Sequence, residues 1–140
     1  MPGVAKQTTV TIIPALQYQD ARAAIEFLCA AFGFEKKAVY EGGGGTIAHA
    51  ELTLGNGMVM LGSVNESAFG KLLMRPRDAG GVTMSVYAIV DDVDAHFARA
   101  KAAGAVVARE PVTQDYGGRD YIAKDPEGHV WTFGTYDPWS

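Results

Sequence analysis

The feature that most constrains the fold of this chain is an internal repeat. An offset of 71 residues, the separation of Asp20 from Asp91, aligns the two halves of the 140-residue sequence without a gap. The identical residues that the offset brings together are Asp20 with Asp91, Ala24 with Ala95, Ala31 with Ala102, Gly33 with Gly104, Gly57 with Gly128 and Val59 with Val130. A repeat of this length predicts two copies of one supersecondary unit that share a core.

Each half has the same order of expected elements, namely a strand, a helix and three more strands. Apolar, β-branched runs predict the first strands, and an acidic residue followed by an apolar face and a closing glycine predicts the helices. The expected strands are 9–16, 36–40, 46–54, 57–62, 82–90, 106–110, 120–124 and 129–134, and the expected helices are 21–32 and 93–103. We therefore predict an α+β fold, a single domain 1–140 of two βαβββ modules (8–64 and 82–136) joined by a linker (65–81).

Composition excludes several classes of partner. Sixteen acidic residues against twelve basic ones give a net charge of −4, whereas a nucleic-acid-binding surface needs a basic excess. The longest apolar runs hold about five to seven residues, far short of a membrane span. The single Cys29 cannot form an internal disulfide, and the start of the chain lacks the pattern of a signal peptide. We expect a cytoplasmic protein that binds neither nucleic acid nor membrane.

Two segments resemble the vicinal oxygen chelate superfamily, which includes glyoxalase I, bleomycin-resistance proteins and extradiol dioxygenases. The stretch 125–134 (DPEGHVWTFG) is similar to the closing hairpin of that family, and Tyr18-Gln19-Asp20 before a helix that ends at Phe32-Gly33-Phe34 is similar to its opening. The resemblance covers about residues 8–136. It implies two curved sheets whose concave faces form a ligand cavity, and a homodimer with sheets either juxtaposed or exchanged.

The resemblance also indicates which positions of this chain would hold a metal. Metal-dependent members hold a divalent ion with His, Gln and Glu from the first and last strands of each module. The corresponding positions here are Ile13 and Ser85 in the first strands, and Leu61 and Thr132 in the last strands. Hydrocarbon side chains cannot ligate a cation, and lone hydroxyls are poor ligands. We therefore predict no metal and no cofactor, with a divalent metal as the alternative.

Strand alternation supplies the polar candidates. In 46–54, Ala50 and Leu52 should face the helix, which directs His49 and Glu51 to the opposite, concave face. His49 and Glu51 are therefore the candidates for acid–base chemistry or for a relocated metal site. The side chains expected to bind the ligand are Ile13, Ile47, His49, Glu51, Val59, Leu61, Asp120, Ile122, Val130 and Thr132.

Other conspicuous side chains are assigned structural roles. We expect Trp131 and Phe133 to pack beneath a helix, Met58 and Met60 to fill the core against the first helix, and His96 to face solvent. The aromatic end of the chain, Tyr136 to Trp139, should cover the cavity mouth or pack on a partner chain.

Three functions fit these expectations. The first is metal-independent binding or sequestration of a small molecule in a dimer. The second is a glyoxalase-like lyase or isomerase that uses His49 and Glu51. The third is a structural or regulatory dimer without a ligand.

Overall fold

The computed structural model describes residues 8–140 and contains two similar α+β modules. The first module consists of β1 (Ala15–Tyr18), α1 (Ala21–Phe32), β2 (Glu35–Glu41), β3 (Ile47–Leu54) and β4 (Gly57–Ser63). The second consists of β5 (Val86–Ile89), α3 (Val93–Ala102), β6 (Val106–Thr113), β7 (Arg119–Lys124) and β8 (Val130–Gly134). The connection between them includes a short helix, α2 (Pro76–Ala79). The βαβββ order is therefore present twice, as the repeat predicted.

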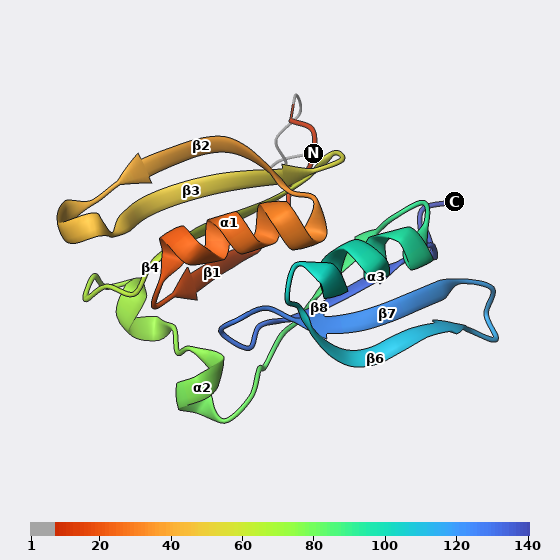
Figure 1. The fold of residues 1–140 in the computed structure, drawn as a ribbon. Helices are drawn as coiled ribbons and strands as arrows, with labels where there is room; N and C mark the ends of the chain where they lie inside the picture. Colours follow the sequence, from red (N-terminus) through yellow and green to blue (C-terminus); the bar gives the residue numbers. More distant parts are fainter. Residues whose placement is uncertain (1–7) are drawn as a thin grey trace.

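Each module is one four-stranded sheet covered on one face by its helix. The strand orders are β1-β4-β3-β2 and β5-β8-β7-β6, with β1 and β5 parallel to their neighbours and the other pairs antiparallel. α1 and α3 lie in front of their own sheets in Figure 1, and the two helices contact each other. No helix within residues 8–140 covers the opposite faces of the two sheets, and we call them the concave faces.

Local signals set the ends of α1. The Asp20 side chain accepts a hydrogen bond from the Ala23 N–H (3.0 Å), which satisfies one free donor of the first turn. At the other end Gly33 adopts φ 86°, a left-handed conformation that costs a glycine little. Between these residues one face of α1 is fully buried, including Leu28 and Phe32. The helix therefore spans the predicted range.

The two modules are joined by buried polar contacts as well as by the core. Asp125, in the β7–β8 connection, accepts hydrogen bonds from the Tyr18 hydroxyl (2.6 Å) and the Trp131 indole (3.1 Å). His96 on α3 bridges the Tyr121 hydroxyl (2.6 Å) and the Phe32 carbonyl at the end of α1 (2.8 Å). His96 is thus half-buried between the modules, and its predicted exposure to solvent is wrong.

The first strand of each module is shorter than predicted. β1 begins at Ala15, directly after Pro14, whose nitrogen cannot donate to a ladder; its carbonyl still accepts from the Met60 N–H (2.9 Å). β5 begins at Val86, and residues 82–85 belong to the connection and not to the sheet. The segments that lead into β1 and β5, residues 12–14 and 82–85, form part of the site described next.

Candidate functional site

A cleft of about 570 Å³ opens where the edge strands β1 and β5 approach the connection between the modules. Its walls come from residues 12–17, from the connection and the start of β5, and from the β7–β8 hairpin. The lining residues are Ile12, Ile13, Pro14, Ala15, Leu16, Gln17, Leu72, Leu73, Met74, Pro76, Ala79, Gly81, Val82, Thr83, Met84, Ser85, Val86, His129 and Val130. Its size is that of a site for a small organic molecule.

The lining is apolar and carries no Asp, Glu, Lys or Arg among the residues that the structure describes. Several of its apolar side chains are open to solvent, with Ile12 82% exposed, Met84 79% and Met74 67%. A contiguous apolar surface of this kind is uncommon on a soluble protein unless something binds to it. Gln17, Thr83, Ser85 and His129 provide the few polar groups.

Two of the ten predicted ligand-binding residues, Ile13 and Val130, line this cleft. The cleft could not be found from sequence patterns because its walls come mainly from segments outside the sheets. Residues 72–81 are expected to be a linker without a motif, and the strand pattern of residues 82–90 does not indicate that residues 82–85 lie outside the sheet. The sequence signal that could have marked this segment is the run Leu72-Leu73-Met74 in a stretch expected to be a surface linker.

The concave face of the first sheet carries the predicted polar pair. Glu51 and its neighbour His49 both lie opposite the helix-covered face, and His49 Nε2 is 3.0 Å from Glu51 Oε2. The Tyr40 ring stacks on the imidazole at a centroid distance of 6.1 Å. The predicted pair therefore forms, on an open face of the sheet and outside the lining of the cleft.

The concave face of the second sheet carries a polar cluster around Asp120, which is only 6% exposed. Its carboxylate accepts hydrogen bonds from Arg109, from Gln114 (3.1 Å) and from the Tyr116 hydroxyl (3.3 Å). Burial acts to raise the pKa of Asp120, but these hydrogen bonds and the Arg109 charge outweigh it and hold that pKa below its ordinary value. The carboxylate is thus occupied by protein partners, so it fixes Arg109 and Tyr116 rather than offering a free charge.

Ile122 lies two residues from Asp120 on β7, so both side chains take the same face of the sheet. Thr132 pairs with Ile122, and both therefore lie on the second concave face, as predicted. Trp131 and Phe133 point to the other side and are buried in the core, which confirms their predicted place beneath a helix.

Three predicted cavity residues lie in the core instead. Val59 and Leu61 pair with Leu52 and Ala50, so all four side chains face α1. Ile47 is also buried, because the β2–β3 register shifts between His49 and Ile47. The predicted orientation of these three side chains toward the cavity is therefore wrong.

Two methionines predicted to lie in the core lie on the concave face instead. Met58 and Met60 alternate with Val59 and Leu61, so they lie on the concave face of β4 and not against α1. Met60 pairs with Glu51 as Thr132 pairs with Ile122, which makes Met60 the structural counterpart of Thr132.

The four positions that correspond to metal ligands do not suit a divalent cation. With Met60 in place of Leu61, they supply a hydrocarbon, a thioether and two hydroxyls, from Ile13, Met60, Ser85 and Thr132. Such a set lacks the carboxylate and imidazole donors that these cations prefer. Within residues 8–140, no group of three or more His, Cys, Asp or Glu side chains is placed to hold a metal.

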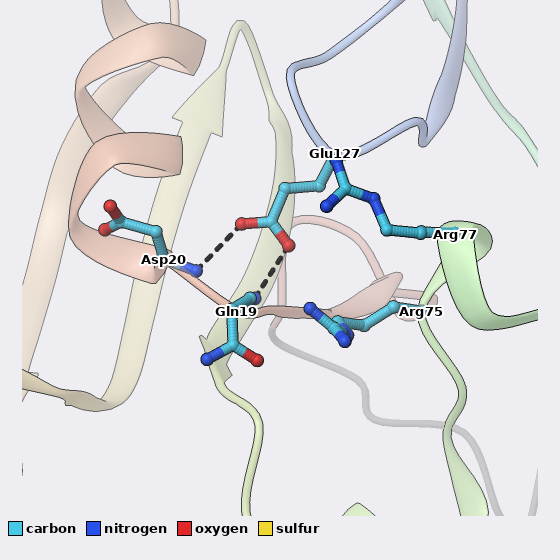
Figure 2. Close-up of a pocket in the computed structure, with 5 residues that line it drawn as sticks. All are labelled: Gln19, Asp20, Arg75, Arg77 and Glu127. Carbon is cyan, nitrogen blue, oxygen red and sulfur yellow. Dashed lines mark hydrogen bonds between the residues drawn. The ribbon is translucent and has the colours of Figure 1, made fainter.

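A second, smaller cavity of about 170 Å³ lies between α2 and the start of α1 (Figure 2). Glu127 reaches across from the β7–β8 connection, and its carboxylate accepts from the backbone N–H groups of Gln19 (2.7 Å) and Asp20 (2.8 Å). Arg75 and Arg77 flank it, and Arg75 pairs with Asp78 (2.9 Å). The hydrogen bonds that Glu127 accepts from Gln19 and Asp20 identify this place as a contact between the modules.

No helix in the described part of the chain is both long and apolar enough to cross a membrane.

Comparison with known proteins shows which family has this fold and sequence pattern. The family model described as Glyoxalase/Bleomycin resistance protein/Dioxygenase superfamily matches residues 10–133. The uncharacterized protein Rv0887c of Mycobacterium tuberculosis is 36% identical over 121 residues, which cover 86% of this chain and 71% of that protein.

Solved structures share this fold. TioX from Micromonospora sp. ML1 is 35% identical, with a TM-score of 0.69 over 88% of this chain and 95% of TioX. The fosfomycin resistance protein FosX from Mesorhizobium loti is 15% identical, with a TM-score of 0.64 over 93% of this chain and 94% of FosX. The likeness to FosX is one of fold alone.

Proposed function

This chain belongs to the glyoxalase/bleomycin resistance protein/dioxygenase superfamily, and on that basis we propose that it binds a neutral, largely apolar small molecule without a metal. The binding site is the cleft at β1, β5 and the connection between the modules. The observation that carries the proposal is the combination of a 570 Å³ volume, an uncharged lining and exposed apolar side chains. The donor set at the four metal positions supports binding that does not depend on a cation.

Two of the predicted ligand-binding residues, Glu51 and Asp120, carry carboxylates that would favour a cationic or hydrogen-bond-donating ligand, but neither residue lines the cleft. Transfer of an ionised group into uncharged apolar surroundings is costly. The cleft therefore selects a neutral molecule.

The test is a fluorescence titration with Nile red, a neutral apolar dye, on the wild-type chain and on Met84→Lys. Met84 is mostly exposed, so the substitution leaves the core intact while placing a charge at the cleft. We expect binding to weaken about tenfold, since apolar contact is lost and a charge is introduced. Val106→Lys, at an exposed apolar residue on β6, is the matched control and should bind as the wild type does. Equal binding by Met84→Lys, or no binding by the wild type, would contradict the proposal.

A second candidate function rests on the His49–Glu51 contact. A histidine hydrogen-bonded to a carboxylate is suited to proton transfer, which a glyoxalase-like lyase or isomerase requires. Under this proposal His49→Ala abolishes turnover in an isomerase assay while the chain stays folded. The control is Thr53→Ala, on the same face of β3. Under the binding proposal His49→Ala leaves Nile red affinity within about twofold.

We also propose a homodimer. Both concave faces are open in the single chain, and each carries exposed large side chains, with Tyr40 on the first and Tyr87 and Ile89 on the second. A second copy would bury these side chains, and a symmetric contact is the commonest solution for such surfaces.

A further inference from the structure

Gln17 is the least exposed polar side chain at the cleft, and its surroundings are unusual for a buried amide. Only 7% of the residue is exposed. Within residues 8–140 its backbone carbonyl accepts from His129 Nε2 (3.1 Å), but no hydrogen bond joins its side-chain amide to another residue. An amide that is covered without a partner costs free energy, so a ligand that covers this side chain must supply its hydrogen bonds.

The amide is nevertheless reachable. Among the described residues, no completely buried side-chain nitrogen or oxygen lacks a hydrogen-bond partner. The unpaired amide atoms of Gln17 must therefore still contact open space, and Gln17 is one of the residues that line the cleft.

The neighbour of Gln17 on β4 leaves room for a ligand. Gln17 pairs with Gly62, which places no side chain next to the amide. A Cβ atom at Gly62 would lie 3.0 Å from the Ala48 carbonyl oxygen, so the glycine cannot readily be replaced by a larger residue. The backbone thus keeps this side of Gln17 open.

We propose that Gln17 is the specificity-determining residue of the cleft and that it selects ligands with a lactam or other cis-amide edge. This inference rests on the proposed function of the cleft. A primary carboxamide presents an acceptor oxygen beside an N–H donor. A cis-amide presents the complementary donor and acceptor at the same spacing, so the two groups form a pair of hydrogen bonds. The uncharged lining excludes carboxylates and ammonium groups, which would otherwise compete for the amide.

The experiment compares 2-quinolinone, a planar lactam, with N-methyl-2-quinolinone, which has lost the N–H donor. Affinities come from chemical-shift titrations of the ¹⁵N-labelled chain, with resonances of the cleft as reporters. We expect the wild type to prefer the lactam about tenfold, because the methylated compound leaves the Gln17 oxygen unpaired.

Gln17→Met keeps the length of the side chain and removes the amide, so the two compounds should then bind within about twofold of each other. Gln19→Met is the matched control, since Gln19 lies outside the cleft lining, and it should retain the tenfold preference. If Gln17→Met does not fold, Gln17→Ala serves the same purpose, and dispersed amide resonances establish that either variant is folded.

Three outcomes would overturn the inference. They are equal binding of the two compounds by the wild type, an unchanged preference in a folded Gln17 variant, and failure of both compounds to shift resonances of the cleft. If Nile red still binds at the cleft in any of these cases, only the role of Gln17 fails. If Nile red does not bind either, the proposed function fails with it.

Discussion

At the scale of single residues, His96 connects three parts of the molecule through one imidazole ring. It bonds to Tyr121 on β7 and to the carbonyl of Phe32 at the end of α1. The centroid of its ring also lies 4.2 Å from that of Phe133 on β8. Burial lowers the pKa of His96 below its ordinary value, although the hydrogen bond to Phe32 acts in the opposite direction. The folded protein therefore favours a neutral His96.

This preference predicts a loss of stability in mild acid. Because the folded state has the lower pKa, the unfolded state takes up the proton first as the pH falls below about 6.5. The contribution of neutral His96 is thus complete above that pH and is lost as the pH falls through the lowered pKa. Urea unfolding at a series of pH values should show this decline in the wild type.

His96→Phe provides the comparison. It keeps an aromatic ring but cannot titrate, so its stability should vary less between pH 7 and pH 5, at a level about 1–3 kcal/mol lower because two hydrogen bonds are lost. Equal pH dependence in the two proteins would show that another group is responsible.

Asp120 predicts a different acid transition. Its lowered pKa means that its contribution is present above the ordinary value of 3.8 and is lost as the pH falls below it. Asp120→Ala leaves Arg109 without its carboxylate partner, and we expect a loss of about 1–2 kcal/mol, reduced from the value for a fully buried pair because Arg109 is partly exposed. Urea unfolding at pH 7 measures it. Asp94→Ala, at an exposed ion pair, is the control and should have a smaller effect.

At the scale of elements, one extra residue in the β7–β8 connection decides which side chains of the last strand face the cavity. Leu52 pairs with Val59, seven residues later, whereas Ala123 pairs with Trp131, eight residues later. The constant offset of 71 residues therefore fails at the last strand, where a slip of one residue exchanges the two faces.

This error separates what the sequence can predict from what it cannot. The ends of α1 follow from Asp20 and Gly33, because capping depends on contacts within a few residues. The orientation of Leu61 depends on strand pairing, and that of Ile47 on a bulge, so neither follows from alternation alone. The cleft depends on segments that approach each other only in the folded chain.

The β7–β8 connection supplies a prediction at the same scale. Glu127 bonds to two backbone N–H groups of the first module, so Glu127→Ala should destabilise the protein by about 1–2 kcal/mol. Thermal or urea unfolding measures this effect. Glu66→Ala, at an exposed glutamate of the connection, is the matched control and should change stability little. A Glu127 variant as stable as the wild type would show that these hydrogen bonds contribute nothing net.

At the scale of the whole molecule, the open concave faces predict the oligomeric state. Light scattering coupled to size-exclusion chromatography should give a mass twice the 14.9 kDa of one chain. Tyr87→Asp, on the second concave face, should shift the protein toward the monomer because a charge would be buried in the contact. Phe69→Asp, at an exposed aromatic of the connection, is the control. A monomer at all concentrations would contradict the proposed dimer.

The composition of the cleft also has a consequence for how this protein could diversify. Much of the wall is a connecting segment, residues 72–85, on which neither sheet depends for its hydrogen bonds. Loops of this kind accept substitutions and changes of length that a core strand would not tolerate. Much of the apolar wall is therefore encoded outside the strands and helices of the two modules. Substitutions in this one loop could change the shape of the cleft while Gln17 and the duplicated architecture stay unchanged.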